Sequence, residues 1–304
     1  MEISFQRYLQ AKRKVDDRAL NRVVWQQLMS QLSFWQSSRP IHVVEIGAGI
    51  GTMLHRLVEW GGLQQGTYLG IDSDHASVEA ARNDLPRWAS EHNLTCTQVT
   101  GEFELSGSGT KIRAAFSPLE VQKFMASPTA VDFDLIIANA FLDLVDPAVL
   151  LLDLGRLLEP SALGWFTINF DGMTVFEPVI DPILDGKIIQ LYHQSMDERR
   201  VDGQPTGGSQ TGRHLYHQMT EAGWQVLAAG ASDWVVHSIQ RAYAHDEAYF
   251  LEFMLHFLNQ TLNGHPQLDP AAFQAWLAAR RAQIIDGELV FIAHQLDFLA
   301  RWPG

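Results

Sequence analysis

Short apolar runs alternate with helix-like segments from residue 41 onward, and this alternation constrains the fold of the 304-residue chain most strongly. The apolar runs are IHVVEI, TYLGID, LTCTQV, FDLIIANA and LGWFTINF. Helical patterns between them cover residues 51–60, 74–89, 118–126 and 147–158. Strands that alternate with helices form a mainly parallel sheet with helices on both faces. The sequence therefore predicts an α/β fold built on a doubly wound, mainly parallel sheet.

The N-terminal and central segments predict a cap and a core around this sheet. Residues 1–40 are expected to form a helical cap, because their apolar residues recur at three- and four-residue intervals. Residues 41–236 form the predicted core. Within it we expect a hairpin at 106–109, and an irregular insertion at 171–210, where Gly, Pro and Asp are frequent.

The C-terminal part is expected to cover the sheet and then complete it. An apolar helical stripe from Tyr249 to Leu258 predicts that residues 237–286 form a helical lid insertion. Residues 287–304 contain the run ELVFIAHQLDFL, which is expected to be the last, antiparallel strand. A buried helix segment remains an alternative for this run. Apolar residues exposed on the lid could also support a homodimer.

Composition argues against several classes of protein. The formal net charge is −13 and the pI is about 5.3, so nucleic acid is not an expected partner. Cys96 is the only cysteine, which excludes an intrachain disulfide and a cysteine zinc cluster. His214 and His217 lack a third ligand in any known pattern, so we expect no metal. Without a leader-like or membrane-spanning apolar stretch, the expected location is cytoplasmic, with no membrane partner.

The stretch VVEIGAGIGTM, residues 43–53, leads from the first strand through three alternating glycines into a helix. Glycines let the backbone approach a ligand without an intervening Cβ atom, and a helix start presents free N–H groups. Open parallel sheets bind ligands at this end of their strands. A dinucleotide, a nucleoside triphosphate and S-adenosylmethionine (SAM) are therefore the candidate ligands.

The residues in and around the loop discriminate among these ligands. A triphosphate-binding loop ends in Lys followed by Ser or Thr, whereas this loop continues with Met53, Leu54 and His55. A dinucleotide loop has the form GxGxxG, but these glycines follow GxGxG and Thr52 takes the third glycine's place. Glu45 would repel a pyrophosphate, whereas it is compatible with a ligand that carries an ammonium group and no phosphate. The loop therefore favours SAM.

Asp72 ends the second predicted strand, in the run LGIDSD. A carboxylate at this position can accept hydrogen bonds from both hydroxyl groups of a ribose. The ligand is therefore expected to be an adenosine derivative. NAD and SAM share this feature, so Asp72 alone does not separate them.

The ordered set EIGAGIG, GID and DLIIANA resembles the class I SAM-dependent methyltransferase superfamily over about residues 40–170. The resemblance implies a seven-stranded, Rossmann-like methyltransferase fold, with SAM as cofactor and S-adenosyl-L-homocysteine (SAH) as its product. It also implies that three glycines line the methionine moiety and that Glu45 holds the loop. These glycines are Gly47, Gly49 and Gly51.

The resemblance assigns the remaining cofactor contacts to the ends of later strands. Asp72 would bind the ribose, Ser73 beside it is a further cofactor-binding residue, and Asn139 and Ala140 would lie near the amino and sulfonium groups. Many members of the superfamily place an Asp after the third strand for the adenine amine. Ser117 stands at the best-aligned position here, which is a departure from that pattern.

Methyl transfer requires a nucleophile held in line with the methyl group in a dry pocket. A general base is needed only when the nucleophile must lose a proton. We hypothesise that His193, Arg200 and Trp234 line the catalytic pocket, because they follow the fifth and sixth predicted strands. His193 is a candidate base or an exposed loop histidine. Arg18 is a candidate for binding the SAM carboxylate or for a surface ion pair.

These observations predict a SAM-dependent methyltransferase that acts on a small-molecule nucleophile. The fourth-strand run from Asn139 to Leu142 lacks the prolines of an NPPY-like motif, and the chain is acidic, so nucleic-acid bases are not expected acceptors. A protein side chain is the second candidate acceptor. A non-catalytic SAM-binding or partner-binding module and, less favoured, an NAD-dependent oxidoreductase remain as alternatives.

Overall fold

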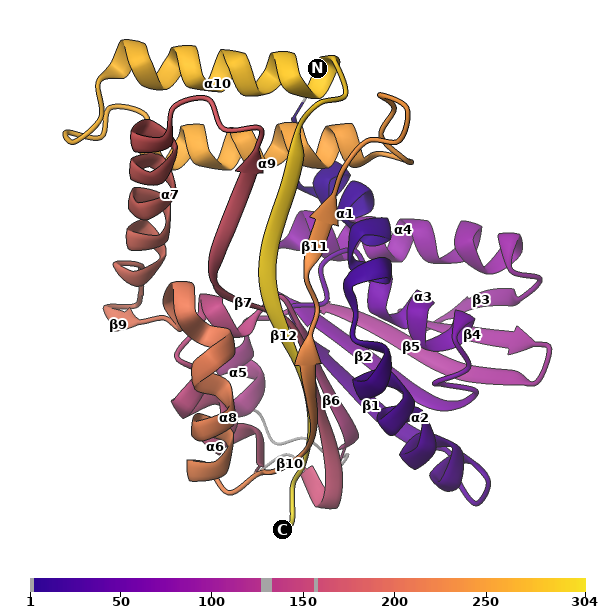
Figure 1. Cartoon of the computed structure of the whole chain (residues 1–304). Helices are drawn as coiled ribbons and strands as arrows, with labels where there is room; N and C mark the ends of the chain where they lie inside the picture. Colours follow the sequence, from indigo (N-terminus) through magenta and orange to yellow (C-terminus); the bar gives the residue numbers. More distant parts are fainter. Residues whose placement is uncertain (1–2, 127–132, 156–157) are drawn as a thin grey trace.

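The computed structural model describes residues 3–126, 133–155 and 158–304, and its central element is one large twisted sheet (Figure 1). The strand order is β10-β12-β7-β6-β1-β2-β5-β4-β3, and β11 pairs with β12. The strands are β1 (Ile41–Ile46), β2 (Gln65–Asp72), β3 (Thr95–Val99), β4 (Glu102–Gly107), β5 (Thr110–Pro118), β6 (Phe133–Asn139), β7 (Leu158–Glu177), β10 (Gln225–Ala231), β11 (Trp234–Val236) and β12 (Val290–Arg301). A separate two-stranded sheet pairs β8 (Arg200–Val201) with β9 (Gln204–Pro205).

The centre of the sheet is parallel, and the strand order reverses at β1, which has β2 on one side and β6 on the other. The strands β5, β2, β1, β6 and β7 pair in parallel, whereas β12 is antiparallel to both β7 and β10. The doubly wound fold and its antiparallel last strand are therefore confirmed, but within the described residues the sheet has ten strands rather than the seven that the resemblance implies, because β3, β4 and β11 add to it. The run LTCTQV forms β3 at the edge, and the third parallel strand is β5, reached through the expected hairpin.

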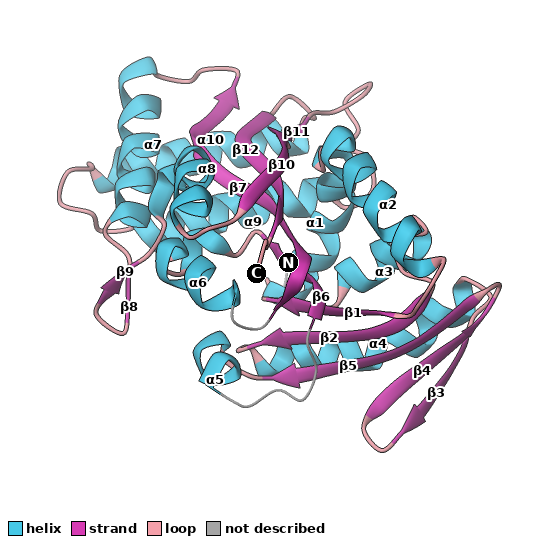
Figure 2. Ribbon diagram, turned by 90° about the horizontal axis from the view of Figure 1, so that it is seen from below, coloured by secondary structure: helices cyan, strands magenta, loops and turns pink. Residues whose placement is uncertain are grey.

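Helices cover both faces of the sheet and also one end of it (Figure 2). The helices are α1 (Phe5–Ala19), α2 (Arg22–Gln36), α3 (Thr52–Glu59), α4 (His75–Glu91), α5 (Val121–Ala126), α6 (Pro147–Leu154), α7 (Pro182–Asp197), α8 (Thr211–Glu221), α9 (Glu247–Leu262) and α10 (Pro270–Ile285). Residues from α2, α3 and α4 share one apolar core, and residues from α5, α6 and α8 share another on the opposite face. The helices α7, α9, α10 and the start of α1 gather at one end of the sheet (Figure 1).

The segment 171–210 differs from the irregular insertion that its Gly, Pro and Asp content predicts. It contains the end of β7, the 16-residue helix α7 and the small β8–β9 hairpin. The Asp and Pro residues mark a helix start, because the Asp181 side chain accepts hydrogen bonds from two backbone N–H groups and Pro182 follows it. The same Asp-Pro pair begins α6 and α10.

The N-terminal cap consists of two helices rather than one continuous helix. The helix α1 ends before Leu20, and the Asn21 side chain caps α2 by accepting hydrogen bonds from the N–H groups of Val23 and Val24. The backbone N–H of Asn21 donates to Asp297 of β12 at 2.8 Å, so the break ties the cap to the sheet. Residues 1–2 of the predicted cap and 156–157 of the helix expected at 147–158 lie outside the described residues.

A helix that crosses a lipid bilayer must be both long and apolar. Within 3–126, 133–155 and 158–304, no helix combines the length and the apolar character that crossing a membrane requires.

Candidate functional site

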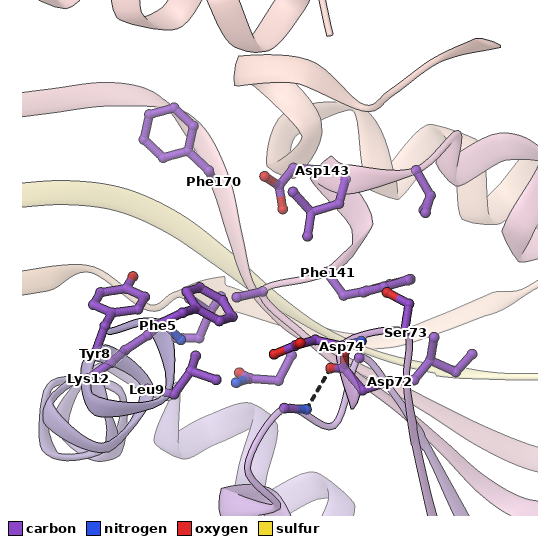
Figure 3. Close-up of a pocket in the computed structure, with 18 of the residues that line it drawn as sticks. Phe5, Tyr8, Leu9, Lys12, Asp72, Ser73, Asp74, Phe141, Asp143 and Phe170 are labelled. Atoms are coloured by element: carbon purple, nitrogen blue, oxygen red, sulfur yellow. Dashed lines mark hydrogen bonds between the residues drawn. The ribbon is translucent and has the colours of Figure 1, made fainter. Parts of the chain in front are cut away.

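A cavity of about 880 Å³ lies at the carboxyl ends of β1, β2 and β6 and extends between α1, α7 and α9. This volume is in the usual range of small-molecule sites, which is about 300–1,000 Å³. We call the part lined by the glycine loop and by residues 71–74 and 139–141 the loop half. The part lined by α1, α7, α9 and Asp143 is the distal half. Figure 3 shows Asp72 and Ser73 on one side of the cavity, with Phe170 and Asp143 on the other.

The glycine loop adopts a backbone that L-residues with side chains rarely use. Gly47, Gly49 and Gly51 have φ values of +68°, +52° and +78°. A Cβ atom on Gly47 would lie 2.4 Å from Cδ2 of Phe141, so this glycine also lets the Phe141 ring approach the loop. Gly47 and Gly49 line the cavity. Gly51 instead lies at the start of α3 and packs against the Phe116 ring, away from the cavity.

We expect the Gly47→Ala variant to bind SAH more weakly and to be less stable than the wild type. The left-handed backbone costs an L-residue about 1–2 kcal/mol, and the new methyl group must also displace the Phe141 ring. Gly186→Ala is the matched control, since its Cβ would meet no atom within 4 Å and the change raises helix propensity in α7. Calorimetry and urea unfolding measure both properties; unchanged SAH affinity in Gly47→Ala would contradict the assignment of this loop.

Asp72 connects the second strand to the glycine loop. Its Oδ2 atom accepts a hydrogen bond from the Gly49 N–H at 2.8 Å, and its Oδ1 atom accepts one from the Asp74 N–H at 2.8 Å (Figure 3 marks the first). Each carboxylate oxygen has a second lone pair, so both can still accept from a ligand. Burial raises the pKa of Asp72, although these two backbone hydrogen bonds lower it. Ser73 lines the same part of the cavity.

Glu45 is a buried acid beneath the loop. Only 2% of its surface is exposed, and the Tyr68 hydroxyl donates a hydrogen bond to its Oε2 atom. Burial raises the pKa of Glu45 to about 8, although the hydrogen bond from Tyr68 and the charge of Arg56 both lower it. Tyr68 belongs to β2, so this contact links the first two strands below the glycines.

We expect the Glu45→Gln variant to gain stability over the wild type as the pH rises from about 5 to about 8. The folded pKa of Glu45 is about 8, whereas an unfolded Glu has a pKa of about 4.3. Between these values the folded state binds more protons, so wild-type stability falls with rising pH. Glutamine stays neutral and avoids this loss. Urea unfolding at both pH values measures the difference, and a difference independent of pH would contradict the buried-acid account.

Asn139 and Ala140 end β6 at the cavity, on the opposite side of β1 from Asp72. The Oδ1 atom of Asn139 accepts a hydrogen bond from the Thr167 hydroxyl at 2.8 Å, which fixes the orientation of the amide. Ala140 has a φ of +51°, and its N–H donates to the Thr167 carbonyl at 2.8 Å. The amide of Asn139 therefore presents N–H donors that this contact with Thr167 does not use.

Besides Gly51, two further residues proposed for the cofactor do not line the cavity. Arg18 forms an ion pair with the buried carboxylate of Glu247 and also donates to the Val235 carbonyl at 3.3 Å, so it joins α1 to α9 and β11. Ser117 lies within β5, and the cavity is lined instead by the segment 119–122 that follows it. The Leu119 N–H donates to the Asp72 carbonyl at 2.9 Å, which holds this segment beside Asp72.

The three residues proposed for the catalytic pocket occupy different environments. Trp234 lines the distal half, and its indole N–H donates to Asp16 at 2.9 Å. His193 lies behind the cavity wall, where its Nε2 atom is 3.0 Å from the Thr174 hydroxyl and its ring packs edge-on against Phe170. Burial lowers the pKa of His193. Arg200 is exposed in the β8–β9 hairpin and does not line the cavity.

The helix α1 brings a neutralised charge pair to the distal half. Lys12 Nζ lies 2.6 Å from Asp16 Oδ2 and 5.2 Å from the centre of the Trp234 ring. Arg56 of α3, which is fully buried, lies 3.6 Å from the same Asp16 oxygen. Because each charge has a partner of opposite sign, this group positions α1 against the loop and β11.

Several lining residues were not identified from the sequence. They come from α1, α7, the turn after β6 and α9, and they include Tyr8, Lys12, Asp143, Tyr192, Arg199 and Phe257. The helix α1 did carry a usable signal, because Tyr8, Lys12 and Asp16 recur at four-residue intervals on one face.

Comparisons with known proteins give structural but no sequence matches. No protein-family model and no curated protein sequence matches the chain. A cyclopropane synthase from Mycobacterium tuberculosis shares 9% identity at a TM-score of 0.45, covering 90% of this chain and 81% of that one. A candidate methyltransferase from Bacillus halodurans shares 10% identity at a TM-score of 0.48, covering 91% and 99%.

A third similar structure is a geranyl diphosphate C-methyltransferase from Streptomyces coelicolor, with 11% identity, a TM-score of 0.40 and coverages of 90% and 79%. These identities and TM-scores are too low to carry information about activity or substrate. The topology of the chain itself is decisive for the fold, since its antiparallel last strand β12 lies between β7 and β10 beside a central parallel sheet. The chain therefore has a Rossmann-like, doubly wound α/β fold.

Proposed function

We propose that this protein is a SAM-dependent methyltransferase that acts on a small molecule. One observation carries the proposal: the glycine loop, Asp72 and Asn139 line the same cavity as the aromatic-rich distal half. The first group suits an adenosyl cofactor, and the second offers space for an acceptor beside it. A module that only binds SAM has no need of the distal half.

The residues of the loop half fit the chemistry of SAM. Asp72 has free lone pairs on both oxygens for the two ribose hydroxyls. The acids Asp72 and Asp74 suit a ligand with a sulfonium and an ammonium group, and they oppose a pyrophosphate. Lys12, rather than Arg18, reaches the cavity and would pair with the carboxylate of the methionine moiety.

The side chains would promote the reaction mainly by positioning and by excluding water. SAM supplies an electrophilic methyl group when bound. Asp72 and the loop would hold the cofactor, while Phe141 and Phe170 would exclude water from the point of transfer. Aromatic faces such as Trp234 would stabilise positive charge in the same space.

The shape and charge of the site favour a small-molecule acceptor. The distal half is lined from α1, β7, α7, β11, α9 and β12, so an acceptor there would be surrounded by protein. The chain carries a net charge of −13, which opposes binding of a nucleic-acid backbone.

Transfer of labelled methyl groups would test this proposal. The protein would be incubated with methyl-labelled SAM and cell extract separated into small-molecule and macromolecular fractions. We expect label to enter the small-molecule fraction with the wild type and not with Asp72→Ala. Label in protein or nucleic acid would contradict the substrate class, and no transfer to any fraction would favour a non-catalytic SAM-binding module.

A further inference from the structure

Asp143 is a carboxylate in the distal half whose ion pair with Arg199 is long. It belongs to the short 3-10 helix η1 (Leu142–Leu144), directly after the end of β6, and its side chain is 14% exposed. The nearest cation is Arg199, whose Nη1 atom lies 3.8 Å from Asp143 Oδ2, beyond hydrogen-bonding distance. Among the described residues, only its own backbone N–H donates a hydrogen bond to it.

The environment of Asp143 contrasts with that of Asp16 in the same cavity. Asp16 has Lys12 at 2.6 Å, Arg56 at 3.6 Å and the Trp234 indole N–H at 2.9 Å. Asp143 has none of these contacts, and burial raises its pKa because the charge of Arg199 only partly compensates for lost hydration. A buried carboxylate in this state is stabilised by a ligand that brings positive charge and N–H donors.

Aromatic side chains line the same half of the cavity as Asp143. Tyr8, Phe170 and Tyr192 line the distal half. Tyr8 and Tyr192 are both close enough for the charge of Asp143 to raise their pKa, and burial is the larger cause at each. Figure 3 shows Phe170 and Asp143 on the same side of the cavity, away from Asp72. Both phenols are therefore neutral, and neutral ring faces attract cations.

The charged residues of the whole cavity also favour a positively charged ligand. Seven acidic residues line it, against only two basic ones. The acids are Asp16, Glu45, Asp72, Asp74, Glu120, Asp143 and Asp202, and the bases are Lys12 and Arg199. One feature opposes this trend, because Arg199 Nη1 is buried without a hydrogen-bond partner and could attract an anion. The charge of Arg199 is already partly compensated by its ion pair with Asp143. The cavity as a whole is therefore expected to prefer a cation.

We propose that Asp143 and the rings of Tyr8, Phe170 and Tyr192 form the acceptor subsite, and that the acceptor is a small apolar amine bound in its ammonium form. This inference rests on the proposed function for the identity of the reaction. It adds the substrate class and a catalytic residue. The carboxylate recognises the ammonium group, and the rings enclose the apolar body.

In the proposed step, proton transfer to Asp143 precedes methyl transfer. The ammonium group gives one proton to the Asp143 carboxylate and becomes a neutral amine. The nitrogen lone pair then forms the N–CH3 bond while the S–CH3 bond breaks, and the electrons of that bond remain on sulfur. The products are SAH and the methylated ammonium ion, and Asp143 later releases its proton to solvent.

Three probes with one phenyl ring test the subsite by calorimetry, both with SAH-saturated protein and without SAH. They are phenethylamine as the cation, 2-phenylethanol as the neutral analogue and 3-phenylpropionate as the anion. We expect phenethylamine to bind at least about tenfold more tightly than the other two. Equal or tighter binding of 3-phenylpropionate would assign recognition to Arg199 and overturn the proposal, as would no binding of any probe.

Variants separate the subsite from the cofactor site. In Asp143→Asn we expect phenethylamine to bind about tenfold more weakly, with 2-phenylethanol and SAH affinities unchanged. Tyr192→Phe keeps the ring face and should retain amine binding, whereas Tyr192→Leu should weaken it. Asp286→Asn, an exposed change after α10, controls for loss of charge. Unchanged amine affinity in Asp143→Asn would overturn the proposed subsite. If the wild type binds phenethylamine but does not bind SAH, only the proposed function is refuted.

Discussion

Replacement of Asp72 by alanine is expected to weaken SAH binding at least about a hundredfold. The carboxylate would accept two ribose hydrogen bonds, and each bond to a charged group contributes about 1.5–3 kcal/mol. The variant also loses the tether from Asp72 to the Gly49 N–H, so the glycine loop is less well ordered before binding. A loss of about 3 kcal/mol corresponds to about a hundredfold in Kd.

A series of variants separates these contributions. Asp72→Asn retains one carbonyl oxygen, so we expect it to bind SAH with an affinity between those of the wild type and Asp72→Ala. Asp84→Ala is the charge-matched control on the nearby helix α4, where Asp84 contacts Arg87 at the surface. Calorimetry measures each Kd. An Asp72→Ala variant that binds SAH as tightly as Asp84→Ala would exclude Asp72 from the cofactor site.

Replacement of Arg56 by methionine is expected to lower the free energy of unfolding by about 3–5 kcal/mol, the usual cost of removing one partner of a buried ion pair. The guanidinium is fully buried, and it lies 2.7 Å from Asp17 and 3.6 Å from Asp16. It also donates to the Arg13 carbonyl at 3.1 Å. Methionine fills much of the volume, but it removes the closest cationic partner of Asp17 and the donor to the Arg13 carbonyl.

Urea unfolding followed by tryptophan fluorescence measures this effect. Arg87→Met is the matched control, because the Arg87–Asp84 pair is exposed on α4 and such pairs contribute about 0–1 kcal/mol. The double variant Arg56→Met with Asp17→Asn removes the charge that is left unpaired, so it should recover part of the lost stability. If Arg56→Met and Arg87→Met have the same stability, the buried pair does not hold α1 to α3.

The loop half could be predicted from the sequence because its determinants are local. The glycines, Glu45 and Asp72 stand at fixed offsets from strand ends, and parallel strands place those ends at one edge of the sheet. Gly51 was misassigned to the cavity wall, since spacing alone does not reveal that Phe116 of β5 packs against it. The positive φ of Ala140 likewise has no local sequence signal.

The distal half could not be predicted because it depends on which helix faces meet. Arg18 and Lys12 are six residues apart on α1, so at about 100° per residue they point in directions about 120° apart. Only Lys12 reaches the cavity. His193 and Tyr192 are neighbours, yet Tyr192 lines the cavity while His193 contacts Thr174. That distinction requires the orientation of α7, which was not expected to be a helix.

Calorimetric titration of the purified protein with SAH and SAM, with NAD and ATP as controls, tests the central claim most directly. We expect micromolar binding of SAH and SAM, no binding of NAD or ATP at the same concentrations, and loss of both adenosyl ligands in Asp72→Ala. Binding of NAD without SAH would contradict the cofactor assignment and with it the proposed methyltransferase.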